Sequence, residues 1–80
     1  MPAIFRKDGF RFYFYSCETG EPPHIHVQYQ AATAKFWIKP VRLSSNQGLK
    51  SKDLAKAARL VCENENLISE KWNEYFAIKN

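Results

Sequence analysis

The chain has 80 residues, with 12 Lys and Arg against 8 Asp and Glu, a formal net charge of +4 and a pI near 9.2. Its 6 Phe, 4 Tyr and 2 Trp give a short chain enough apolar surface for a dense core, which argues against disorder and predicts a single domain over residues 1–80. The positive charge attracts an anionic partner, such as a nucleic acid or an acidic protein.

The two cysteines carry no paired spacing. Cys17 and Cys62 are therefore expected to be reduced thiols of a cytosolic protein and not part of a disulfide scaffold. Cys62 is expected to be a small, buried apolar side chain. Residues 1–6 contain no signal-peptide core, and no apolar run of about 18 residues occurs. We expect a soluble, cytoplasmic protein that is not associated with a membrane.

The first half of the sequence predicts β-strands. Residues 10–15 alternate strictly between Phe and other side chains, and Asp8-Gly9 before them is a strong turn signal. Residues 3–6 are therefore expected to pair with this strand as a hairpin.

A loop and further strands follow. Residues 18–23 end in tandem prolines and predict a loop. Alternation returns over residues 24–30 and 34–39, Pro40 ends the second of these strands, and residues 41–43 are a candidate for a short fifth strand.

The second half predicts helices. Residues 44–48 are expected to form the connecting loop, and Ser51 is a candidate N-cap. Apolar residues at helical spacing then run to Val61 and again from Ile68 to Phe76, with Asn66 able to cap the second helix. The pattern predicts an α+β fold, an antiparallel sheet of four to five strands covered on one face by two C-terminal helices.

Strand alternation also predicts which residues lie on the uncovered face of this sheet. His24 and His26 are the only histidines, and two residues apart on a strand they share a face, with ring centres roughly 6 to 7 Å apart in a regular strand. If the Phe and branched aliphatic positions are covered, the uncovered face carries Arg11, Tyr13, Tyr15, His24, His26, Gln28, Lys35, Trp37 and Lys39.

This basic and aromatic face is typical of nucleic-acid binding. Arg and Lys neutralise phosphates, and exposed aromatic rings stack on unpaired bases. The residues expected to contact RNA are Arg11, Tyr13, Tyr15, Trp37 and Lys39. Equally, Tyr and Trp on such a face pair across strands for stability, while cations keep an open sheet soluble.

The histidines suggest a stronger hypothesis, a metal-independent ribonuclease. His24 and His26 would act as general acid and base on the ribose-phosphate backbone, and Lys35 or Arg11 would stabilise the charge that develops on phosphorus.

The alternative chemistry for the histidines is a zinc site that takes its third ligand from the adjoining loop, at Cys17, Glu18 or Glu21. None of these has a recognisable ligand spacing, and the nearby lysines repel a cation. We therefore expect neither a metal nor a cofactor.

The sequence also resembles a known family. Residues 2–6, the aromatic strand 10–15, Glu21-Pro22-Pro23-His24-Ile25-His26-Val27, residues 34–37 and residues 72–76 resemble a family of small bacterial proteins called domain of unknown function 4160. The resemblance places the signature histidines at His24 and His26 and provides no catalytic assignment. It implies a gene beside that of another small protein, an arrangement similar to a toxin–antitoxin pair.

The function expected from these features is RNA binding, with cleavage as its stronger form, within a toxin–antitoxin-like module. A non-enzymatic module that binds the product of a neighbouring gene is the alternative.

Overall fold

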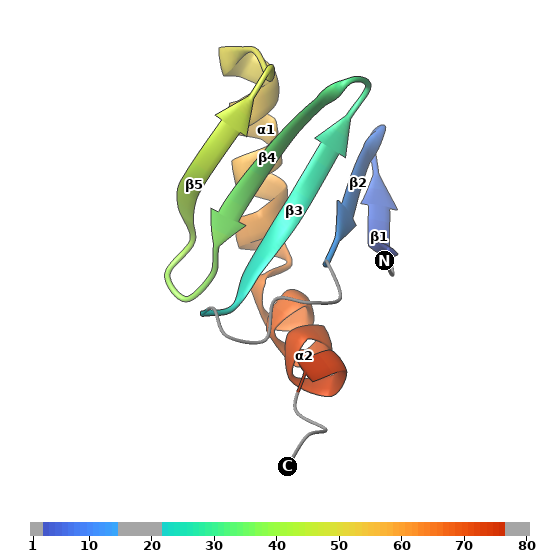
Figure 1. The fold of residues 1–80 in the computed structure, drawn as a ribbon, viewed down its shortest axis with the longest axis vertical. Helices are drawn as coiled ribbons and strands as arrows, with labels where there is room; N and C mark the ends of the chain where they lie inside the picture. The colour runs from blue at the N-terminus through green and yellow to red at the C-terminus, as the bar shows by residue number, and fades with distance from the viewer. Residues whose placement is uncertain (1–2, 15–21, 77–80) are drawn as a thin grey trace.

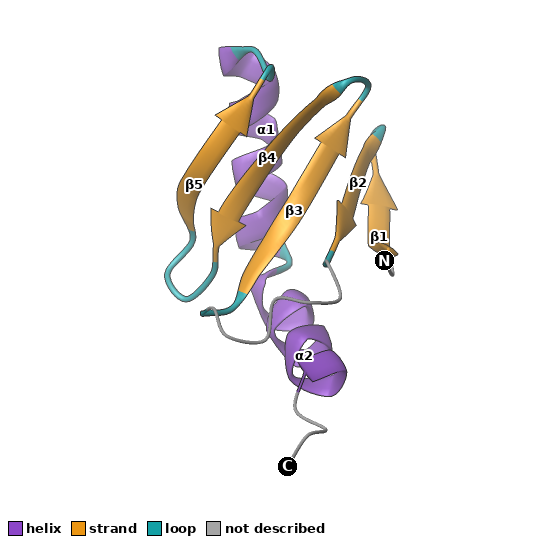
Figure 2. Cartoon of the chain, viewed as in Figure 1, coloured by secondary structure: helices purple, strands orange, loops and turns teal. Residues whose placement is uncertain are grey.

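The computed structural model describes residues 3–14 and 22–76. Five strands form one antiparallel sheet in chain order, and two helices follow (Figures 1 and 2). The elements are β1 Ala3–Lys7, β2 Phe10–Tyr13, β3 His24–Tyr29, β4 Ala32–Trp37, β5 Arg42–Gln47, α1 Ser51–Glu63 and α2 Glu65–Phe76. The predicted α+β class is confirmed.

The hairpin between β1 and β2 is confirmed at its predicted turn. Asp8 and Gly9 both have positive φ, 52° and 87°, which is the backbone of a type I′ turn and matches the twist of the two strands. A Cβ on Gly9 would lie 3.1 Å from Cε1 of Tyr29, so the turn also packs closely against β3.

Strand β5 extends further than expected, because residues 44–47 are strand and not loop. All six of its residues are exposed, and pairing with β4 satisfies its backbone on one side only. A polar composition is compatible with such an edge strand. Asn46 then closes the turn into α1, since its Oδ1 accepts from Leu49 N at 3.0 Å and its Nδ2 donates to Leu49 O at 3.1 Å.

The helix ends also differ from the prediction. Lys50 is the N-cap of α1 and makes no side-chain capping bond, so Ser51 is the first helical residue and does not cap the helix. Asn64 lies at the junction of the helices and its carbonyl accepts from Ile68 N at 2.9 Å. The second helix therefore begins before Asn66.

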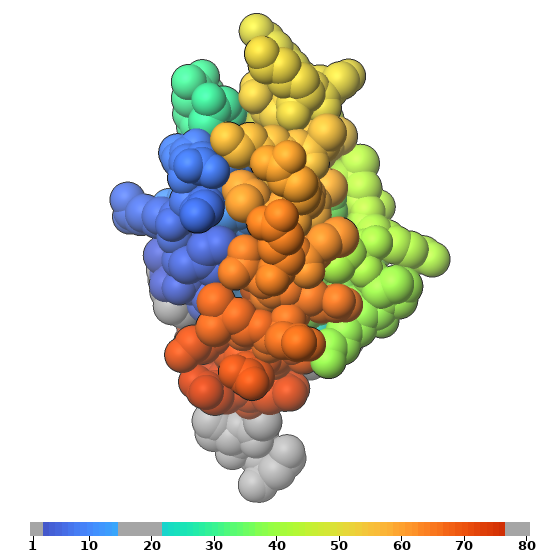
Figure 3. Space-filling view, turned by 180° about the vertical axis from the view of Figure 1, so that it is seen from behind, coloured from blue at the N-terminus to red at the C-terminus, as the bar shows by residue number. Residues whose placement is uncertain are grey.

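The core lies between the sheet and α1, and the predicted strand faces are confirmed. Phe10, Phe12, Phe14, Ile25, Val27, Phe36 and Ile38 are all buried. They belong to one cluster with Ala57, Leu60 and Val61 of α1 and with Ile68 and Trp72 of α2. Viewed from behind, α1 runs over the middle of the sheet and α2 continues the column toward the lower end of the molecule (Figure 3). Cys62 is exposed on α1, so its predicted burial is wrong.

Helix α2 lies beyond one end of the sheet and not directly behind it (Figure 1). Trp72 packs edge-to-face on Phe14, with ring centroids 5.2 Å apart, and its ring lies 5.0 Å from that of His24. Phe14 belongs to the covered core and His24 to the opposite face of the sheet, so Trp72 contacts residues of both faces.

Candidate functional site

The face of the sheet opposite α1, called the open face below, brings together most of the predicted site residues. Residues in direct register across strands share a face. Three rows cross the open face: Arg11, Gln28, Thr33 and Gln47; Tyr13, His26, Lys35 and Ser45; and His24, Trp37 and Arg42.

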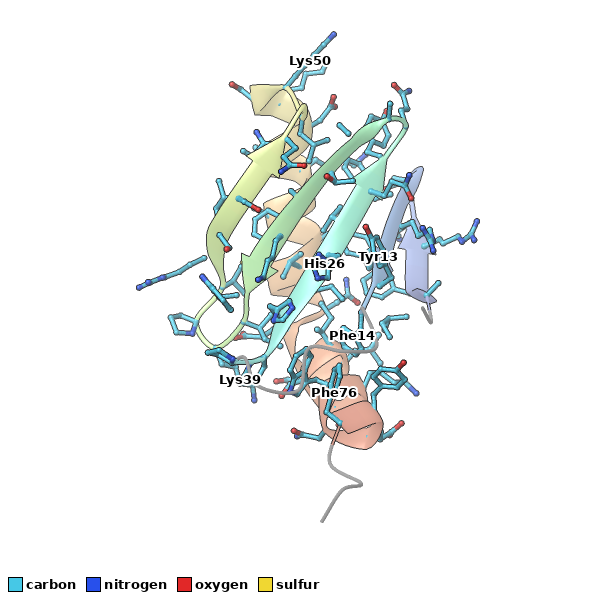
Figure 4. All side chains as sticks on the ribbon, viewed as in Figure 1. Tyr13, Phe14, His26, Lys39, Lys50 and Phe76 are labelled. Atoms are coloured by element: carbon cyan, nitrogen blue, oxygen red, sulfur yellow. The ribbon has the colours of Figure 1, made fainter. Side chains whose placement is uncertain are left out.

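His26 lies in the middle of the open face (Figure 4). Its half-buried ring stacks on that of Tyr13, with centroids 5.5 Å apart and planes inclined by 23°. Beside it is a shallow hollow of about 190 Å³, called the His26 hollow below, whose polar side chains include Lys35, Ser45 and Gln47. Imidazole, ammonium, hydroxyl and amide groups thus line one small concavity, a combination suited to a phosphate group.

The expected exposure of His24 is wrong, because its side chain has no exposed surface. The ring packs against those of Trp37 and Trp72, with ring centroids 5.6 Å and 5.0 Å away. Strand parity correctly gives its face but does not show that α2 reaches around the sheet end to contact it.

The hydrogen bond of His24 defines its tautomer. Nδ1 lies 2.9 Å from the carbonyl oxygen of Pro22. A carbonyl only accepts, so Nδ1 carries a proton and donates it, and in the neutral ring the lone pair lies on Nε2. The bond joins the start of β3 to the proline segment before it.

The two imidazoles are close, with ring centroids 5.1 Å apart and planes at 83°. This is nearer than a regular strand predicts. A buried ring does not touch a bound molecule, however, so in this conformation only His26 of the pair reaches a ligand on the open face.

Tyr13 does not provide the exposed stacking surface that was expected, because it is only 4% exposed. The Arg11 guanidinium lies 4.6 Å from its ring centroid, and His26 stacks on it. Arg11 itself is half-buried and donates to Oε1 of Gln28 at 2.8 Å. These contacts make Tyr13 and Arg11 a packed part of the face.

Trp37 is the accessible aromatic side chain among the described residues of the open face. It is half-buried, and the ammonium group of Lys35 lies 4.7 Å from its ring centroid. Lys39 follows β4 and is exposed, and its amide donates to Oε2 of Glu65 at 3.1 Å. The last predicted RNA contact, Tyr15, lies outside the described residues.

The charges are distributed unevenly between sheet and helices. In residues 3–14 and 22–50 the only carboxylate is Asp8, in the β1–β2 turn, where Lys56 of α1 lies 3.5 Å from it. The acidic residues of the helices are Asp53, Glu63, Glu65, Glu70 and Glu74. The described strand positions of the open face therefore carry cations and no carboxylate.

The described residues contain no group of three metal-binding side chains. Cys17, Glu18 and Glu21, the third-ligand candidates, lie in the part that the structure does not describe. Within the described ranges, no helix is both long and apolar enough to span a membrane.

Sequence reasoning missed the contribution of β5. Ser45 and Gln47 line the His26 hollow, and Arg42 stands opposite Trp37. The candidate fifth strand is limited to residues 41–43, and the polar composition of residues 44–48 predicts a loop, so Ser45 and Gln47 were not expected on this face.

Comparison with known protein families identifies the family of this chain. Residues 9–73 match a family model described as domain of unknown function (DUF4160). No curated protein and no solved structure matches the chain.

Proposed function

The chain belongs to the DUF4160 family, whose description assigns no activity, and from the geometry of its site we propose that the open face binds single-stranded RNA. The observation that supports this most directly is the row Tyr13, His26, Lys35 and Ser45, which runs across four strands beside the partly exposed Trp37. Cations for phosphates and an aromatic ring for an unpaired base lie on one face.

The charge distribution supports the same proposal. Cations neutralise phosphates, and the described strand positions of this face carry cations and no carboxylate. Double-stranded RNA is read mainly through its shape and backbone, whereas an aromatic side chain stacks only on bases that are unpaired.

The experiment is a binding titration with fluorescein-labelled oligouridine over a range of salt concentrations. We expect a steep loss of affinity with added salt. Lys35→Glu should weaken binding and reduce the slope of log K against log salt by at least about 0.7, the value of one phosphate contact on a single strand.

Lys52→Glu is the matched control. It makes the same change in net charge on α1, behind the sheet, and should leave the slope unchanged. Equal effects of the two substitutions would mean that only the total charge matters, and the proposed interface would be wrong.

The stronger form of the proposal is RNA cleavage, centred on His26 with Lys35. His26 would take the 2′-hydroxyl proton as the 2′-oxygen bonds to phosphorus, and Lys35 would stabilise the negative charge that develops on the phosphoryl oxygens. The P–O5′ bond would then break, and the 5′-oxygen would leave with a proton from the second imidazole. His24 could act as the second imidazole only after a change of conformation that exposes its ring, because the ring is buried. His26→Ala should then abolish RNA cleavage and growth inhibition while oligouridine still binds, and cleavage by this variant at the wild-type rate would rule the mechanism out.

A second candidate function is docking of a partner protein, and the edge of β5 favours it. All six β5 residues are exposed, and Leu43 is 47% exposed beside a hollow that Leu54, Ala58 and Cys62 also line. An edge strand offers backbone groups to an incoming strand. The partner would be the product of a neighbouring gene in a toxin–antitoxin-like module.

The partner proposal is tested with the purified neighbour product. Leu43→Glu should abolish its binding and leave oligouridine affinity unchanged, whereas Lys35→Glu should do the reverse. Partner binding that survives Leu43→Glu would exclude this edge as the docking site.

A further inference from the structure

A second hollow lies at the end of the open face where β3 begins and β4 ends. Its volume is about 340 Å³, within the ~300–1,000 Å³ typical of small-ligand sites. Trp37, Lys39 and Arg42 line it together with three proline rings, Pro22, Pro23 and Pro40. We call it the proline hollow.

Three hydrogen bonds hold the backbone that lines the proline hollow. His24 Nδ1 donates to the Pro22 carbonyl at 2.9 Å, and Ile38 N donates to the Pro23 carbonyl at 3.2 Å. Lys39 N donates to Glu65 Oε2 at 3.1 Å. Prolines have restricted backbones, so a ligand here meets a preorganised surface and loses less affinity to ordering.

The chemistry of the lining suits a flat, electron-rich ring. Trp37 provides an aromatic surface, the prolines provide apolar walls, and Arg42 stands in register with Trp37 on the same face. Guanidinium groups stack on nucleobases and donate hydrogen bonds to their edges. Lys39 adds a further cation beside this surface.

The two hollows of the open face are neighbours. The ammonium group of Lys35, which lines the His26 hollow, lies 4.7 Å from the ring centroid of Trp37, which lines the proline hollow. The buried ring of His24 packs against a ring of each hollow, with centroids 5.1 Å from that of His26 and 5.6 Å from that of Trp37. The two hollows are therefore adjacent, as a phosphate site and a base site for one nucleotide must be.

We propose that the proline hollow is a nucleobase subsite, which takes one unpaired base of an RNA strand whose phosphate lies in the His26 hollow. This inference rests on the proposed function. It assigns Trp37, Pro23, Pro40 and Arg42 to base binding, and it makes His24 a positioning residue for the Pro22 wall.

The test compares oligouridine with an abasic ribose-phosphate strand of the same length, at one salt concentration. The wild-type protein should bind the base-bearing strand about 5- to 150-fold more tightly, the value of one stacked base. Trp37→Ala should remove this preference without changing the salt slope, because the phosphate contacts remain. Trp37→Phe should keep most of the preference.

Two further variants separate the subsite from the fold and from phosphate binding. Arg42→Ala changes an exposed edge residue, leaves the far-UV circular dichroism unchanged and should reduce the base preference. Lys35→Gln should reduce the affinity for the base-bearing strand and for the abasic strand by the same factor.

The outcomes distinguish the two proposals. Equal wild-type affinity for both strands would overturn the base subsite while RNA binding stands. No binding of either strand would overturn both.

Discussion

The ring of Trp72 in α2 lies 5.0 Å from the buried ring of His24 in β3. This contact joins the last helix to the strand that carries both histidines. It makes His24 a buried part of the packed structure, with its Nδ1 proton donated to the Pro22 carbonyl. Of the two imidazoles on the open face, His26 is therefore the one with exposed surface.

Trp72→Ala should destabilise the protein by about 3–5 kcal/mol, because it removes a buried aromatic ring that also packs on Phe14 and Phe76. Urea denaturation measures the loss. Tyr75→Ala is the control in the same helix and should cost less, since Tyr75 is 38% exposed. An equal loss of unfolding free energy in the two variants would contradict the larger contribution of Trp72 to stability.

His24→Phe keeps a ring between Trp37 and Trp72 but removes the hydrogen bond to Pro22. We expect it to lower the free energy of unfolding by about 1 kcal/mol, the typical net contribution of one hydrogen bond. His24→Ala also leaves a cavity and should cost more. A His24→Ala protein as stable as the wild type in urea would show that the buried ring contributes nothing.

Gly9→Ala should destabilise the β1–β2 hairpin by about 1–2 kcal/mol or more. Its φ of 87° is strained for any residue with a Cβ, and that atom would lie 3.1 Å from Tyr29 Cε1. Asp8→Asn is the control, because Asn tolerates positive φ and the exposed pair with Lys56 contributes about 0–1 kcal/mol. A shift of the urea midpoint for Asp8→Asn as large as that for Gly9→Ala would contradict this explanation.

Asn46→Ala removes both hydrogen bonds to the Leu49 backbone and should cost about 1–3 kcal/mol. The adjacent Gln47→Ala is exposed and should change stability by less than about 0.5 kcal/mol. Thermal unfolding of the two variants side by side measures the difference, and a reversed order would mean that the Asn46 turn is not what positions α1.

The strand faces and the first turn could be predicted from the sequence because both depend on local chemistry. Alternation over residues 10–14 gives the buried phenylalanines, and Asp8-Gly9 gives the hairpin. Residues 44–47 could not be assigned as strand, since an exposed edge strand needs no apolar face and its polar residues resemble a loop.

The candidate site was only partly predictable for a different reason. Alternation correctly places His24, His26, Lys35 and Trp37 on one face. It does not reveal that Trp72, far along the chain, covers His24, or that Arg11 and His26 pack on Tyr13. Exposure depends on where α2 docks, and helical periodicity fixes the apolar stripe of a helix but not its position.

The bond from the Lys39 amide to the Glu65 carboxylate ties the β4–β5 connection to the first residue of α2. Energetic coupling between two places in a protein is reciprocal. A molecule that binds this connection and strengthens the bond should therefore stabilise α2 against local opening, and its binding should reduce hydrogen exchange at the amides of that helix.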